Sequence, residues 1–152
     1  MDQNRICLGQ GEQVFQRAVR AIREWKMFDL GWVELCWPGA PIAEGTSVAV
    51  LVRHFGFWSL NAARIVYVVQ ESPPVRRYGF AYGTLADHAE RGEERFTVEW
   101  RPDDSVWYDL LAFSRPKHFL AQIAYPLSRG LQRRFALDSM QSMLRSSAPL
   151  GA

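Results

Sequence analysis

The sequence predicts an α+β fold: a curved antiparallel sheet of about seven strands that holds a long C-terminal helix, with one further helix after the first strand. Two patterns lead to this prediction. Residues 94–101 and 106–114 alternate between apolar and polar side chains on either side of a proline turn, as paired strands do. Residues 117–145 place their apolar side chains at helical spacing instead. Because a sheet with one apolar face needs a cover, we expect the long helix to lie on it.

The composition is typical of a folded single domain. The chain has 152 residues, of which 48% are hydrophobic and 13% aromatic, enough to bury a substantial core. We expect one domain over residues 1–152, with its core at about 4–146 and a frayed C-terminal tail. The net charge of +2 is too small to indicate a nucleic-acid partner, and no apolar run has the length of a membrane span. Cys7 and Cys36 are too few for a disulfide-rich secreted domain, so we expect reduced thiols and a cytoplasmic location.

The first third of the chain is expected to open with a short strand at 5–8 and an amphipathic helix at 12–26. Two further strands follow at 32–37 and 46–55, separated by a turn rich in proline and glycine. Apolar residues three or four positions apart form the buried side of the helix. Its charged side, which we expect to face solvent, carries Arg17, Arg20, Arg23 and Glu24.

The middle of the chain is expected to hold strands at 62–70 and 75–84. Both faces of 62–70 are apolar, so we expect a central strand that is covered on both sides. The aromatic segment 55–58 before it either folds over the core or lines the mouth of a pocket. A charged loop over 85–95 is expected to separate 75–84 from the next strand.

The turn after residue 101 predicts how the last two strands pair. Proline followed by two aspartates is favourable for a tight turn, and a turn centred on Asp103 sets the register. Apolar side chains then lie opposite one another, which supports that register. The predicted pairs are Phe96 with Leu110, Val98 with Tyr108 and Trp100 with Val106.

The C-terminal helix is expected to carry a broad apolar stripe along its length. Pro126 falls early in this segment and is expected to mark a kink, or a break between a short helix and a long one. The stripe consists of Leu120, Ala124, Leu127, Leu131, Phe135, Met140 and Leu144.

The strand 78–84 has an unusual alternation. One face carries Tyr78, Phe80, Tyr82 and Thr84, whereas the other carries only two glycines and an alanine. The length of the following loop leaves two arrangements open. Either the glycine face turns toward the long helix, or the rings do and line a pocket themselves. Bare backbone usually means that something packs close to it, which favours the first arrangement.

The order of these elements resembles the helix-grip fold of the steroidogenic-acute-regulatory-related lipid-transfer and birch-pollen-allergen superfamily. That resemblance implies a ligand cavity between the sheet and the C-terminal helix. A closer resemblance, over nearly the whole chain, is to the uncharacterised DUF1990 family, which brings no established activity. It is carried by Tyr78-Gly79-Phe80-Ala81-Tyr82-Gly83-Thr84-Leu85, His88, Glu90, Gly92-Glu93-Glu94, Phe96, Trp107, Phe113-Ser114-Arg115-Pro116 and Gln132-Arg133.

Candidate site residues follow from position and chemistry. A histidine beside carboxylates can exchange protons near neutral pH, which makes His88, Glu90 and Glu93 the catalytic candidates, although the same carboxylates can simply fix the loop. Arg115 lies where the last strand meets the helix and could hold an anionic group or bond to strand carbonyls. No metal signature, nucleophile motif or cofactor motif occurs. The ligand-binding candidates are Tyr82, Thr84, Arg115, Asn61, Trp107 and Phe57.

Three functions are compatible with these residues. The first is a binding protein for a small apolar or amphipathic ligand held between sheet and helix. The second is an acid–base enzyme of the cyclase or hydratase kind on the same fold, using Tyr82, His88 or a loop glutamate. The third is an interaction protein whose interior is fully packed. Fold alone does not decide among them.

Overall fold

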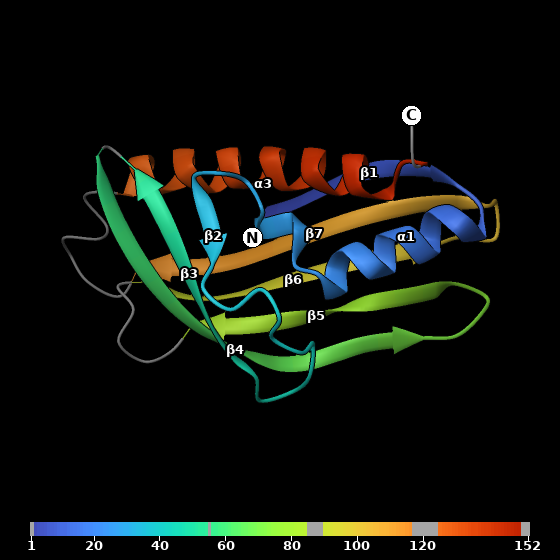
Figure 1. Cartoon of the computed structure of the whole chain (residues 1–152), viewed down its shortest axis with the longest axis horizontal. Helices are drawn as coiled ribbons and strands as arrows, with labels where there is room; N and C mark the ends of the chain where they lie inside the picture. Colours follow the sequence, from blue (N-terminus) through green and yellow to red (C-terminus); the bar gives the residue numbers. More distant parts are fainter. Residues whose placement is uncertain (1, 55, 85–89, 117–124, 150–152) are drawn as a thin grey trace.

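Seven strands form one antiparallel sheet in the computed structural model, which describes residues 2–54, 56–84, 90–116 and 125–149. The strand order is β1-β7-β6-β5-β4-β3-β2, so the first strand lies beside the last. Figure 1 shows the curled sheet with α3 and α1 along it, which confirms the predicted fold class. The elements are β1 (Asp2–Gln10), α1 (Glu12–Arg23), the 3₁₀ turn η1 (Lys26–Phe28), β2 (Val33–Leu35), β3 (Ser47–His54), β4 (Phe57–Glu71), β5 (Arg76–Thr84), β6 (Glu90–Trp100), β7 (Ser105–Pro116) and α3 (Tyr125–Ser147).

The β6–β7 hairpin has the register that the turn predicted. Side-chain hydrogen bonds support this turn: the amide of Ser105 donates to Asp103 Oδ1 at 3.0 Å, and Trp100 Nε1 donates to Asp104 Oδ1 at 3.0 Å. Asp104 adopts a left-handed conformation with φ of 73°, which aspartate tolerates better than most residues. The three apolar pairs are Phe96 with Leu110, Val98 with Tyr108 and Trp100 with Val106, as predicted.

The rings of β5, and not its glycines, face the helices. Phe80 pairs with Phe96 and is fully buried, while Tyr82 pairs with Glu94 on the same inner face. The expectation that the glycine face turns toward the long helix was therefore wrong. The bare backbone has a different cause, because Gly79 lies on the outer face where β6 approaches closely. A Cβ atom at Gly79 would lie 1.9 Å from the carbonyl oxygen of Phe96.

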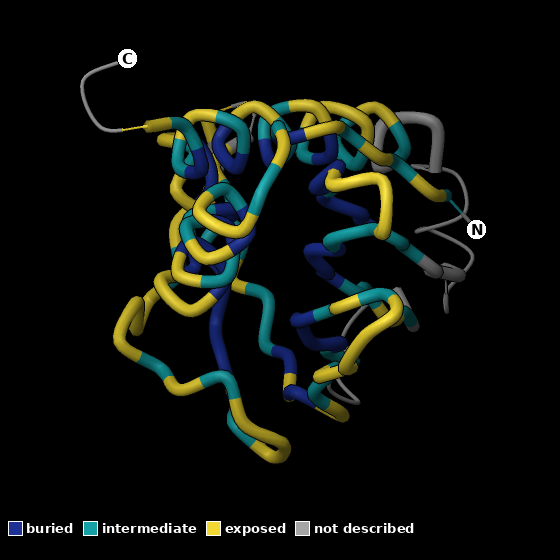
Figure 2. Tube along the Cα trace, turned by 90° about the vertical axis from the view of Figure 1, so that its right-hand side faces the viewer, coloured by how far each residue is buried: buried dark blue, intermediate teal, exposed yellow. Residues whose placement is uncertain are grey.

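The helices pack on the inner face of the sheet. Figure 2 shows the buried residues concentrated where helices and strands face one another. In α1 the predicted apolar stripe is confirmed, since Phe15, Ala18 and Ile22 are buried. The charged side of α1 is only partly a solvent face: Arg17 Nε donates to the carbonyl of Ser147 at 2.8 Å, at the C-terminal end of α3.

The described members of the predicted α3 stripe pack against the core but are only partly buried: Leu131, Phe135, Met140 and Leu144. Leu120, Ala124 and the side chain of Leu127 lie outside the described residues. The most buried positions of the helix are an alanine, three serines and Met143. α1 and η1 both pack on α3, and small side chains allow this close approach. The serine hydroxyls are bonded within the core: Ser139 lies 2.8 Å from Tyr108 Oη, and Ser142 donates to the carbonyl of Lys26 at 2.6 Å. The buried seam comprises Ala136, Ser139, Ser142, Met143 and Ser147.

Pro126 lies in the first turn of α3, where a helix needs no amide donor. It is therefore compatible with the start of the helix and does not break it. The short helix predicted before it falls on residues 117–124, outside the described residues.

β4 and β6 are longer than predicted. β4 begins at Phe57, so the second half of the segment expected to be an aromatic loop is strand, and β6 already begins at Glu90 within the expected charged loop. β4 is an inner strand of the sheet, but it is not covered on both sides. Its outer face exposes Leu60 to 64% and Tyr67 to 38%. A β-bulge between Ile65 and Tyr67 shifts the pairing with β5.

The outer face of the sheet carries a cluster of ion pairs. Asp109, which interrupts an apolar strand, pairs with Arg5 Nε at 3.2 Å and accepts a hydrogen bond from Gln3 Nε2 at 2.9 Å. Glu99 accepts bonds from Arg77 Nε at 2.9 Å and Arg101 Nε at 2.6 Å. Both carboxylates are buried, and these long polar side chains provide their cover on the outer face.

Acid is expected to remove the stabilisation that Glu99 supplies. Burial alone would raise the pKa of Glu99, but hydrogen bonds from Arg101 and Arg77 outweigh it and lower the pKa below the ordinary value. A lowered pKa stabilises the fold above the unfolded value of about 4.3, and this contribution is lost as pH falls below it. The melting temperatures of the parent and Glu99→Gln should therefore converge between pH 6 and pH 3. A difference in melting temperature that stays constant over this pH range would contradict the prediction. Glu24→Gln serves as the control, because Glu24 is exposed.

Two further observations concern cysteine and membranes. Cys7 and Cys36 are both free and exposed. Among the helices that the structure describes, none is long and apolar enough to cross a lipid bilayer.

Candidate functional site

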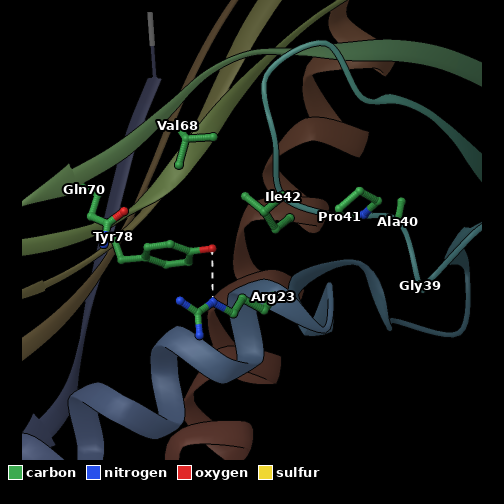
Figure 3. Close-up of a pocket in the computed structure, with 8 residues that line it drawn as sticks. All are labelled: Arg23, Gly39, Ala40, Pro41, Ile42, Val68, Gln70 and Tyr78. Carbon is green, nitrogen blue, oxygen red and sulfur yellow. Dashed lines mark hydrogen bonds between the residues drawn. The ribbon is translucent and has the colours of Figure 1, made fainter.

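An open pocket lies between the C-terminal end of α1, the segment 39–42 and the inner face of β4 and β5. Its volume is about 420 Å³, within the range of small-molecule sites. Figure 3 shows the lining side chains arriving from these three sides. The lining residues are Arg23, Gly39, Ala40, Pro41, Ile42, Val68, Gln70 and Tyr78.

The end of α1 positions two sides of this pocket. Trp25 adopts a left-handed conformation with φ of 58°, which ends the helix and turns the chain into η1. The buried Trp25 indole donates from Nε1 to the carbonyl of Ala40 at 2.8 Å, which holds the segment 39–42 over the pocket. Arg23, at the last position of α1, then reaches the strand side of the pocket.

Arg23 and Tyr78 form the polar end of the pocket. Arg23 Nε donates to the hydroxyl of Tyr78 at 3.3 Å, and the guanidinium carbon lies 5.0 Å from the centre of the Tyr78 ring. Tyr78 is only 8% exposed, whereas Arg23 is exposed. The opposite walls are apolar, since Ile42 and Val68 are partly buried against the core. The pocket thus joins a polar end to apolar walls, and its lining is mixed in polarity.

A second polar pair lies inside the cluster of rings between sheet and helices. Tyr82 donates from its hydroxyl to Glu94 Oε2 at 2.8 Å, and its ring stacks on Phe96 at 5.5 Å with an interplanar angle of 2°. Burial, reinforced by the charge of Glu94, raises the pKa of Tyr82 well above its ordinary value. Tyr82 therefore stays a neutral hydrogen-bond donor across the physiological range and cannot serve as a base there.

The same burial argument applies to Tyr108, which bonds to Ser139 deeper in the core. Desolvation raises the pKa of Tyr108, although the hydrogen bond with Ser139 works in the opposite direction.

We define the ring cluster as the aromatic side chains that pack around Phe96 on the inner face. Its members are Trp25, Phe28, Phe80, Tyr82, Phe96 and Phe135.

Two predicted ligand residues lie on the inner face. Tyr82 belongs to the ring cluster, and Asn61 pairs with the buried Val50 on β3. Asn61 donates from Nδ2 to the hydroxyl of Ser59 at 3.3 Å. The two residues have different partners, so they do not form one polar group.

Two other candidates lie on the outer face. The guanidinium carbons of Arg101 and Arg5 lie 4.9 Å and 5.8 Å from the centre of the Trp107 ring. Glu93 accepts a hydrogen bond from Tyr67 Oη at 3.1 Å. The sheet therefore separates both of them from Tyr82. Of the remaining candidates, His88 lies outside the described residues, as do the side chains of Phe57, Thr84, Glu90 and Arg115.

Of the pocket residues, the sequence pointed to Tyr78 alone, through the second arrangement of strand 78–84, in which the rings line a pocket. Arg23 was assigned to the solvent side of its helix, and the other lining residues were not singled out. One signal was available: Arg23 follows Val19 by four positions and therefore borders the apolar stripe. Within the described part of the chain, no three histidine, cysteine, aspartate or glutamate side chains gather as a metal site would require.

Comparison with known proteins decides the family. The model of the family described as "Domain of unknown function (DUF1990)" matches residues 1–142. The chain belongs to the DUF1990 family. Relatives within it are named UPF0548 proteins. One from Dictyostelium discoideum is 44% identical, over 96% of this chain and 72% of its own length. One from Deinococcus radiodurans is 39% identical, over 95% and 76%, and At2g17695 from Arabidopsis thaliana is 31% identical, over 93% and 70%.

Two solved structures share the fold of this DUF1990 chain. The hypothetical protein jhp0584 from Helicobacter pylori has a TM-score of 0.64 at 12% identity, covering 96% of this chain and 86% of its own. The protein TTHA0849 from Thermus thermophilus has a TM-score of 0.65 at 10% identity, covering 95% and 94%. At these identities the likeness concerns the fold alone. The predicted membership of DUF1990 is thus confirmed, and the curled sheet with its C-terminal helix is compatible with the predicted helix-grip architecture.

Proposed function

We propose that this chain acts as a single domain that binds a small, largely apolar ligand in the pocket between α1, the segment 39–42 and the strands β4 and β5. The observation that carries the proposal is the pocket itself. About 420 Å³ of open space adjoins the apolar side chains of Ile42 and Val68, with polar groups gathered at one end. Such a combination is typical of small-molecule sites.

The position of this pocket modifies the cavity expected from the sequence. That cavity was predicted between the sheet and the C-terminal helix. Where the structure describes both, Phe135 of α3 packs on Phe28 and Phe96, and Met143 is fully buried. We therefore favour the side of the sheet next to α1 as the ligand site. A cytoplasmic location, expected from the small number of cysteines, remains part of the proposal.

Acid–base catalysis has less support from the geometry. Glu93 lies on the outer face, and Tyr82 is held as a neutral donor by burial and by Glu94. A binding role needs neither residue to change its protonation state. It needs only the pocket and its apolar walls.

A neutral apolar dye, N-phenyl-1-naphthylamine, is expected to bind saturably with one molecule per chain and to gain fluorescence. Val68→Trp should weaken that binding at least tenfold, because a larger side chain at this inner position fills the pocket. The matched control is Val66→Trp on the same strand. Val66 is 42% exposed on the outer face, beside Gly83, so this variant should bind the dye like the parent.

Equal dye binding by the parent and Val68→Trp would overturn the proposal, as would the absence of saturable binding. In the second case a packed interaction protein would account better for the fold. Circular dichroism of both variants establishes that each is folded before the titrations are compared.

A further inference from the structure

The polar end of the pocket carries hydrogen-bond donors for which the described residues provide no acceptor. Arg23 Nε already donates to the Tyr78 hydroxyl, so the oxygen of that hydroxyl is an acceptor in this bond. The phenolic proton of Tyr78 must therefore point elsewhere. In the described part of the chain, no acceptor is recorded for this proton, although Tyr78 is only 8% exposed.

The guanidinium of Arg23 adds further donors at the same place. A guanidinium has five N–H groups, and only that of Nε has a recorded partner in the described residues. No salt bridge between Arg23 and a carboxylate occurs there. The guanidinium is instead held against the Tyr78 ring, with its carbon 5.0 Å from the ring centre. Figure 3 shows the Tyr78 hydroxyl between Arg23 and the apolar side chains of Val68 and Ile42.

From this juxtaposition we infer that the pocket selects an amphipathic monoanion, a carboxylate with an apolar chain, and that Arg23 and Tyr78 hold its carboxylate. The inference rests on the proposed function and specifies its ligand class. A carboxylate supplies acceptors only, so it matches the remaining donors of Arg23 and Tyr78 at this end of the pocket. Arg23 contributes a single positive charge among the lining residues, which favours a monoanion over a phosphate dianion.

The apolar chain of such a ligand has a defined direction. Leaving the carboxylate at Tyr78, it can follow Val68 on one side and Ile42 on the other, both partly buried against the core. Gln70 lies beside Tyr78 in the sheet, because the two residues are paired across β4 and β5. Its amide offers one more donor near the carboxylate.

Octanoate and octan-1-ol provide a direct test, because they share an eight-carbon chain and differ in the charge of the head. By titration calorimetry, the parent is expected to bind octanoate at least tenfold more tightly than octan-1-ol. Arg23→Gln should lower the affinity for octanoate at least tenfold and leave the affinity for octan-1-ol unchanged. Tyr78→Phe, which removes only the hydroxyl, should lower the affinity for octanoate several-fold. Arg20→Gln is the control, since Arg20 is exposed on the same helix and does not line the pocket.

The outcomes separate the inference from the function beneath it. If the parent binds both probes with equal affinity, or if Arg23→Gln keeps the preference for octanoate, the inference of a monoanionic ligand is overturned. The proposal of apolar binding then remains intact. Binding of neither probe counts against the pocket as a ligand site and overturns both. Inorganic phosphate added in excess should not displace octanoate. Displacement would show that the polar end of the pocket binds phosphate instead. Arg23 is exposed, so Arg23→Gln is expected to melt like the parent, which keeps the comparison valid.

Discussion

Gly79→Ala is expected to destabilise the protein by about 3 kcal/mol or more. A Cβ atom at Gly79 would lie 1.9 Å from the carbonyl oxygen of Phe96 and 2.8 Å from the Cα atom of Thr97. Both are backbone atoms of β6, so no side-chain rotation relieves the overlap. The two strands would have to separate where Gly79 pairs with Thr97.

Urea unfolding measured by circular dichroism tests this expectation, with Gly83→Ala as the matched control. Gly83 lies on the same face of β5, but its Cβ atom would meet Val66 Cγ1 at 3.5 Å, an ordinary van der Waals contact. This variant should stay within about 1 kcal/mol of the parent. If both variants unfold at the same urea concentration, the close approach of β6 is not what Gly79 accommodates.

Phe96→Ala is expected to cost about 3–5 kcal/mol, the range measured for large aromatic residues deleted from cores. Phe96 is fully buried at the centre of the ring cluster. Its removal would leave a cavity that strands on both sides hold open, because Phe96 pairs with Phe80 and with Leu110. The centre of the Phe96 ring lies 5.3 Å from the ring centre of Phe28, 5.3 Å from that of Phe80, 5.5 Å from that of Tyr82 and 6.4 Å from that of Phe135.

The control for Phe96→Ala is Trp37→Ala. Trp37 is a larger ring but is 62% exposed, so its removal should change stability by less than about 0.5 kcal/mol. Thermal melts of both variants, followed in the near ultraviolet, report packing of the rings as well as unfolding. A small loss for Phe96→Ala would mean that the ring cluster rearranges to fill the space.

The β6–β7 hairpin and the β5 strand show what the sequence could and could not predict. In the hairpin, a tight turn around Asp103 fixes which residues face each other, so pattern and register could be derived together. For β5, the loop to β6 leaves open which face turns inward, and the alternation of rings and glycines fits either choice. The pairing of Phe80 with Phe96 decides it, and this is a tertiary contact.

The candidate site was less predictable for a similar reason. Its residues come from α1, the segment 39–42 and the strands β4 and β5, which are separated along the chain. No local pattern links Arg23 to Tyr78. The serine-rich seam of α3 illustrates the same limit, since Ser139 is buried only because Tyr108 reaches it from the sheet. Hydrophobic periodicity cannot identify a polar side chain whose partner lies on a distant strand.

The pairing of β1 with β7 has a consequence for how the protein forms. Asp2 lies opposite Ala112, so the first strand of the chain pairs with the last one. During synthesis, residues 2–10 emerge long before β7 is available to pair with them. Loop closure over such a sequence distance is slow compared with the formation of local hairpins. The hairpin of β6 and β7 is therefore expected to form first, and the N-terminal strand to add to its edge as a late step of folding.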